Sequence, residues 1–152
     1  DKLELFAKKH IDGHAPGIRG KEVQAYRLAG VENDHECSTA EEVLDKLRAG
    51  LHIYVREGSG AKNLETLIKT MLDAGVCLDR CAFCTDDKHV EEIRKEGHIS
   101  TCIRKAIALG VPVAKAYKMG SYQAAEFYGL KNYGAIGAGY RADIVFRAGQ
   151  TA

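Results

Sequence analysis

The chain has 152 residues, 45% of them hydrophobic and 28% charged, and its 22 Lys and Arg residues nearly balance 21 Asp and Glu residues. This length is typical of about one globular domain. The net charge is +1, so the chain does not carry the excess of basic residues that binds nucleic-acid phosphates or a membrane surface. No apolar run approaches the ~20 residues of a membrane-spanning helix. We therefore expect no nucleic-acid or membrane partner, and a cytoplasmic location.

The ends and the cysteines of the sequence add two further expectations. The chain begins at Asp1 and not at Met, and both ends resemble internal positions, so we expect the natural chain to be longer. Five cysteines are an odd number, and reduced thiols are the default in a cytoplasm. Cys77, Cys81 and Cys84 have a spacing that could form part of a zinc site, but a structural zinc site needs four ligands. We favour plain packing for these thiols.

Strand-like and helical segments alternate along the chain. Strands are predicted before His14 and at 31–35, 51–56, 81–85 and 142–146. Helices are predicted at about 40–49, 61–74, 99–109, 112–119 and 122–128, where apolar residues recur at helical spacing. Thr39 and Glu42 fit a capping box for the first of these helices, and Ser121 is expected to cap the last. This alternation predicts βαβ units and a parallel sheet.

Metal-ligating or acidic residues follow four of the predicted strands. His14, His35, Glu57 and Asp86 are separated by 21, 22 and 29 residues, which is about one βα unit each. In a (β/α)8 barrel the carboxyl ends of all strands meet at one mouth. Imidazole and carboxylate groups there are suitable ligands for zinc, iron or manganese. The spacing alone leaves open whether the two histidines bind metal or are hydrogen-bonded structural residues. The other four histidines are expected to be structural or to lie at the surface: His10, His52, His89 and His98.

Six motifs occur in an order that resembles the adenine deaminase family of the amidohydrolase superfamily, and the resemblance covers nearly the whole chain. The motifs are Asp12-Gly13-His14-Ala15-Pro16-Gly17, Asn33-Asp34-His35-Glu36-Cys37, Arg56-Glu57-Gly58-Ser59, the run 83–89, Glu96-Gly97-His98-Ile99 and the run 134–143. The resemblance implies a hydrolase that converts adenine to hypoxanthine and ammonia in purine salvage. It also implies a divalent metal cofactor, binuclear manganese or iron, with zinc as an alternative.

The resemblance also implies roles for particular residues. His14, His35 and Asp86 correspond to metal ligands at the ends of strands five, six and eight. Asp86 is in addition the catalytic proton shuttle, which takes a proton from the attacking water and passes it to the leaving amine. Glu36, Glu57 and Asp87 are candidate contacts to the purine.

Two of these assignments have structural alternatives. Asp87 could cap the following helix. Glu57 could be a buried partner of Arg56 or Lys62.

The implied fold class is α/β, namely the second half of a metal-dependent (β/α)8 TIM barrel of the amidohydrolase type plus the start of a small β-sandwich domain. Residues 1–140 are assigned to the barrel half and residues 141–152 to the returning sandwich strand. The His-x-His pair of strand one and the acidic bridging ligand of strand four are absent from the chain. We therefore expect part of a homo-oligomeric enzyme, poorly folded and inactive when made alone. Two alternatives stay open: an amidohydrolase for another aminopurine or a cyclic amide, and a non-catalytic metal-binding fragment.

Overall fold

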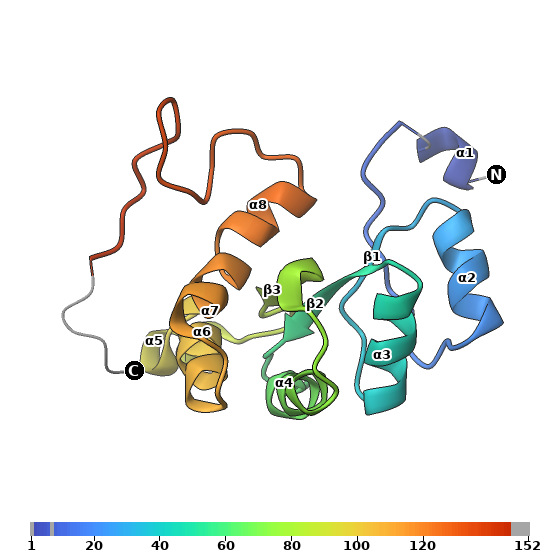
Figure 1. Ribbon diagram of the computed structural model, residues 1–152, viewed down its shortest axis with the longest axis horizontal. Coiled ribbons are helices and arrows are strands. Elements are labelled where there is room, and N and C mark those ends of the chain that lie inside the picture. The colour runs from blue at the N-terminus through green and yellow to red at the C-terminus, as the bar shows by residue number, and fades with distance from the viewer. Residues whose placement is uncertain (1, 7, 147–152) are drawn as a thin grey trace.

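A three-stranded parallel sheet lies at the centre of the computed structural model, which describes residues 2–6 and 8–146 (Figure 1). The strands β1 (Asn33–Asp34), β2 (His52–Arg56) and β3 (Cys81–Cys84) lie side by side in chain order. The 3-10 turn η1 (Leu78–Arg80) leads into β3. The helices are α1 (Lys2–Phe6), α2 (Lys21–Leu28), α3 (Ala40–Arg48), α4 (Leu64–Asp73), α5 (Val90–Glu96), α6 (Ile99–Ala108), α7 (Val113–Met119) and α8 (Tyr122–Phe127).

The helices that follow the strands form a row beside the sheet. Helix α3 connects β1 to β2 and α4 connects β2 to β3, and α3 packs against α4, α4 against α6, and α6 against α7 (Figure 1). Consecutive parallel strands with their connecting helices in one layer are typical of the (β/α)8 barrel superfamily. The architecture therefore agrees with the predicted α/β class.

Alternation along the strands divides the core into two clusters. Successive side chains of a strand point to opposite faces, so Ile53 and Val55 pack with the helix layer in a large apolar core. Tyr54 and Ala82 point to the other face, where Phe127 of α8 covers them. Helix α8 therefore packs on the sheet face opposite the helix row.

Local signals explain where helices α3 and α4 begin. The predicted capping box is present, because Thr39 Oγ1 accepts from the Glu42 amide and the Glu42 carboxylate accepts from the Thr39 amide. Helix α4 begins at Leu64, three residues later than predicted. The preceding segment instead forms a tight turn, in which the Gly58 amide donates to the Ala61 carbonyl.

Several expectations about local structure are wrong. Residues 10–15 form no strand, because the amides of Gly13 and Ala15 donate to the side chains of Asn33 and Asp34 and not to a neighbouring strand. The strand predicted at 31–35 shortens to β1. Ser121 does not cap α8 with its side chain, since its hydroxyl donates back to a main-chain carbonyl of α7.

Residues 142–146 also lack the predicted strand. Strand formation requires a neighbouring strand for hydrogen bonding, and Ile144, Val145 and Phe146 lie exposed without one in the described part of the chain. The rest of the segment predicted for the sandwich, 147–152, lies outside the described residues. The boundary at residues 140 and 141 remains a prediction.

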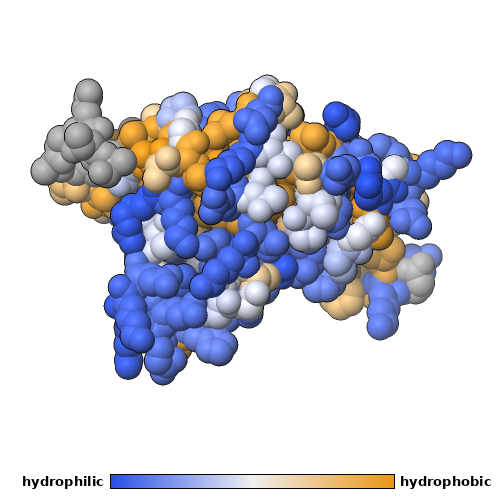
Figure 2. Space-filling view, turned by 90° about the horizontal axis from the view of Figure 1, so that it is seen from below, coloured by the Kyte–Doolittle hydropathy of each residue, from blue (hydrophilic) through white to orange (hydrophobic). Residues whose placement is uncertain are grey.

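Hydrophilic residues cover most of the face seen from below, and apolar residues gather in its upper left part (Figure 2). This face includes α4 and the lower ends of neighbouring helices, so a polar surface there is consistent with a helix layer that faces solvent. Among the described residues, no helix has both the length and the apolar character needed to cross a bilayer.

Candidate metal centre

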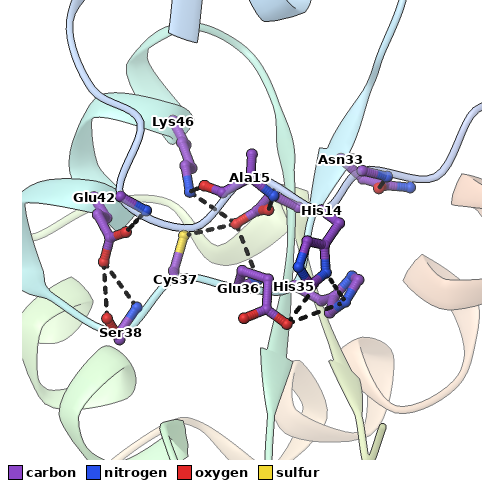
Figure 3. Close-up of polar contacts among 12 residues, drawn as sticks. His14, Ala15, Asn33, His35, Glu36, Cys37, Ser38, Glu42 and Lys46 are labelled. Atoms are coloured by element: carbon purple, nitrogen blue, oxygen red, sulfur yellow. Dashed lines mark hydrogen bonds and ion pairs between the residues drawn. The ribbon is translucent and has the colours of Figure 1, made fainter. Parts of the chain in front are cut away.

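His14, His35 and Glu36 converge where the loop before α2 meets the end of β1 (Figure 3). The His14 Nδ1 and His35 Nε2 atoms are 3.4 Å apart. Glu36 Oε1 lies 3.5 Å from His14 Nδ1 and 3.4 Å from His35 Nε2. The two rings meet edge to face, with centroids 5.3 Å apart. The structure thus brings together the two predicted histidine ligands and one carboxylate predicted to contact substrate.

The three ligand atoms suit a divalent metal. Ligands bonded at about 2.1 Å in a tetrahedral arrangement are separated by roughly 3.4 Å, close to the separations seen here. Imidazole nitrogen and carboxylate oxygen are ligands that zinc, iron and manganese share. In the described part of the chain, no other group of three or more His, Cys, Asp or Glu residues has its ligand atoms within 4.8 Å of one another. The side chains of Cys77, Cys81 and Cys84 do not form such a group among the described residues.

Arg56 connects Glu36 to Asp86. It is the last residue of β2, and its guanidinium donates to both Glu36 oxygens and, from Nη1 at 3.0 Å, to Asp86 Oδ2. Burial lowers the pKa of Arg56, but the bonds to Glu36 and Asp86 outweigh this effect and raise it. Arg56 therefore stays cationic beside two carboxylates.

Asp86, predicted as a metal ligand and proton shuttle, lies two residues after the end of β3. Its contact to the group is the bond from the Arg56 guanidinium. Its backbone has a φ of 44°, a left-handed conformation that Asp tolerates better than most residues. Its side chain is 40% exposed, so water can reach the carboxylate.

The structure does not bring Glu57 into this group. Because Glu57 follows Arg56, strand alternation directs it to the helix side. There its Oε1 accepts from Lys105 Nζ at 2.6 Å, and its side chain is only 5% exposed. Glu57 is therefore buried in an ion pair, but its partner is Lys105 and not Arg56 or Lys62.

Asp87 also lies outside the group. Its carboxylate accepts from the amides of Ser59 at 3.1 Å and Gly60 at 2.8 Å. Helix α5 begins after His89, so Asp87 does not occupy its N-cap position. The carboxylate instead fixes the turn that follows β2.

Two of the remaining histidines have partners that are typical of structural residues. His98 Nε2 lies 2.7 Å from Thr85 Oγ1. His52 packs on the ring of Phe127 and lies 3.2 Å from an Arg80 guanidinium nitrogen. Burial, followed by the nearby charge of Arg80, lowers the pKa of His52 to about 4.

Sequence reasoning missed three buried polar residues behind the candidate ligands. Asn33, Asp34 and Lys46 are each 0% exposed. The sequence does contain a pattern that indicates a buried Lys46, because this residue lies three residues after Val43 on the apolar face of α3. A lysine on such a face requires a buried acidic partner.

Comparisons with known proteins show the family of this chain. The model of the Amidohydrolase family matches residues 2–150. The adenine deaminase of Clostridium acetobutylicum is 48% identical over 147 residues, and that of Cereibacter sphaeroides (strain ATCC 17025) is 46% identical over 147 residues. The adenine deaminase of Desulfitobacterium hafniense is 44% identical over 144 residues. Each alignment covers 95% of this chain but 25% of the relative, so the chain spans about a quarter of the length of these curated relatives. His14 and His35 lie side by side, one in a loop and one at the end of a strand. Because the family model also matches nearly the whole chain, the chain belongs to the amidohydrolase family.

Proposed function

We propose that the chain is part of a metal-dependent adenine deaminase, which hydrolyses adenine to hypoxanthine and ammonia. The observation that carries the proposal is the convergence of His14, His35 and Glu36 in a chain that is 44–48% identical to adenine deaminases over 95% of its length. The proposed setting is purine salvage in the cytoplasm, in a homo-oligomer.

The proposed fold follows from the order of the strands. In this proposal β1, β2 and β3 are the sixth, seventh and eighth strands of a (β/α)8 barrel, with residues 1–140 in the barrel and 141–152 in a β-sandwich domain. The parallel, sequential strand order supports the barrel assignment. The ligands that the family carries on earlier strands would come from chain segments outside this sequence.

His14 and His35 are the proposed metal ligands, and Glu36 is close enough to join them. The metal, manganese or iron with zinc as an alternative, would supply Lewis-acid activation of water when bound. Asp86 is proposed to bind at the same centre once Arg56 releases its carboxylate, which is 3.0 Å from the guanidinium. Arg56 would then keep Glu36 oriented through the bond from its Nη2 atom to Glu36 Oε2.

Proton transfer is assigned to Asp86. Its water-accessible carboxylate would accept a proton from the attacking water and donate it to the departing amine, which is ordinary general base and general acid chemistry. Glu36 is the proposed purine contact best supported by position, because it lies with the histidines. The same role for Glu57 and Asp87 finds no support in their contacts to Lys105 and to the turn after β2.

The test is ammonia release from adenine by the full-length protein that contains this chain, loaded with Mn²⁺ or Fe²⁺. We expect turnover of adenine, and a loss of about 10²- to 10⁴-fold in kcat for Asp86→Asn. The control variant Glu91→Gln changes an exposed carboxylate of α5 and should leave turnover unchanged. Release from another aminopurine or a cyclic amide, with none from adenine, would favour a different amidohydrolase. Metal binding without any release would favour a non-catalytic protein.

A further inference from the structure

A buried ion pair lies directly behind the candidate metal ligands. Lys46 Nζ of α3 donates to Asp34 Oδ2 at 2.9 Å, and both side chains are 0% exposed. A buried ion pair by itself contributes little net stability, because removing both charges from water offsets their attraction. The function of this pair therefore lies in the groups that it holds.

Asp34 and Lys46 hold both sides of the Ala15 residue that follows His14. Asp34 Oδ1 accepts from the Ala15 amide at 2.8 Å, and Lys46 Nζ donates to the Ala15 carbonyl at 2.6 Å. The second oxygen of Asp34 accepts from the Glu36 amide at 3.0 Å. One carboxylate thus connects the loop that carries His14 to the chain that carries Glu36.

Asn33 holds Gly13, the residue that precedes His14. Its Oδ1 accepts from the Gly13 amide at 2.6 Å. A Cβ added at Gly13 would lie 1.9 Å from the Asn33 carbonyl oxygen, so the two backbones approach as closely as only glycine permits. The two residues that flank His14, Gly13 and Ala15, are therefore held by three side chains that are entirely buried.

We propose that Asp34 and Lys46 are positioning residues that fix His14 relative to His35 and Glu36 and thereby set the affinity of the site for a divalent metal. This inference rests on the proposed metal site. The His14 side chain is 67% exposed on a loop without regular structure, so its position depends on the main-chain contacts of that loop. Besides the cluster, these are the bond from the His14 amide to the Tyr26 hydroxyl at 2.9 Å and the bond from the Gly17 amide to Glu42. Residues that orient metal ligands from behind commonly change metal affinity by about 10- to 100-fold when they are replaced.

The test uses the full-length, metal-free protein with Zn²⁺ alone as the probe, titrated in competition with a chelator. Asp34→Asn keeps the shape of the side chain but removes the charge opposite Lys46 and places an amide group among donors. We expect its zinc affinity to fall by about 10- to 100-fold. Leu67→Ala is the control, because it destabilises the buried core without replacing any residue that contacts the His14 loop, and its affinity should stay within about threefold of the parent.

Thermal unfolding of each variant separates positioning from stability. Equal losses of affinity in Asp34→Asn and in an equally destabilised Leu67→Ala would overturn the proposal, as would an unchanged affinity in Asp34→Asn. The double variant Asp34→Asn/Lys46→Met leaves no unpaired buried charge, so it provides a second measurement if the single variant does not fold. It should show the same weakened binding. An unchanged affinity in it would also overturn the proposal.

The affinity of His35→Ala distinguishes this inference from the proposed function. If His35→Ala binds zinc as the parent does, the proposed metal site itself is wrong. If His35→Ala loses zinc and Asp34→Asn does not, only the positioning role is wrong.

Discussion

Glu42 carries more hydrogen bonds than its place in a capping box requires, and its replacement by glutamine tests what those bonds contribute. The carboxylate accepts from the amides of Gly17, Ser38 and Thr39, at 2.6, 3.0 and 3.0 Å, and from two hydroxyls. The bond to Gly17 attaches the loop that carries His14 to the start of α3. Burial raises the pKa of Glu42, but these hydrogen bonds outweigh it and lower the pKa to about 2.

The magnitude follows from that pKa. A shift from 4.5 to about 2 corresponds to about 3 kcal/mol of stability at neutral pH. Since glutamine retains one carbonyl oxygen and some of the bonds, we expect Glu42→Gln to lower the free energy of unfolding by about 2 kcal/mol. The contribution is fully present above pH 4.5 and declines as the pH falls towards 2, because the unfolded state binds the proton first.

The assay is urea unfolding of the metal-free full-length protein at pH 7 and at pH 3.5, followed by circular dichroism. The difference between parent and Glu42→Gln should be about 1 kcal/mol smaller at pH 3.5. Glu41→Gln is the matched control, because Glu41 is an exposed carboxylate in the same helical turn and should change stability by less than about 0.5 kcal/mol. A Glu42→Gln difference that is negligible at pH 7, or that does not vary with pH, would refute the reasoning.

Three further predictions concern the site and its surroundings. Gly13→Ala forces a Cβ against the Asn33 carbonyl oxygen, so zinc affinity in the chelator assay should fall by about tenfold. Lys105→Met leaves the buried Glu57 carboxylate without its ion-pair partner, and urea unfolding should show a loss of about 1–3 kcal/mol. His52, with its pKa lowered to about 4, should stay neutral in an NMR titration down to pH 5, and its contribution to stability should be lost as the pH falls from 6.5 towards 4.

Each of these predictions has its own contrary result. Gly137→Ala places a Cβ only against the ring of Tyr140, and an equal loss of zinc affinity there would exclude a specific effect at Gly13. The double variant Lys105→Met/Glu57→Gln should recover part of the stability lost in Lys105→Met, and no recovery would contradict the ion-pair explanation. A titration midpoint near 6.5 for His52 would show that its burial does not govern its protonation.

The helices that the sequence predicted best are those with local signals. Helix α3 has its capping box and helix α6 its apolar spacing, and both were placed within about a residue. Helices α7 and α8 were placed equally well from their apolar spacing, although the expected Ser121 side-chain cap is absent. Helix α2 was not predicted, because Val23 is its only buried residue and its apolar pattern is too sparse. The strand expected before His14 failed for a different reason: the acceptors for its amides are side chains of β1, 19 and 20 residues away.

Residue type and spacing were enough to place His14, His35 and Asp86 at the ends of predicted strands. The reason is that the spacing of apolar residues and the residues that end helices and strands can be read locally along the chain. Only the tertiary structure decided which polar groups meet. It put Glu36 beside the histidines, inserted Arg56 between Glu36 and Asp86, and turned Glu57 to the opposite face of the sheet. The physical reason is that a one-residue step along a strand reverses the direction of a side chain. Spacing therefore locates a site only to within a residue or two, and the fold selects the side chains that form it.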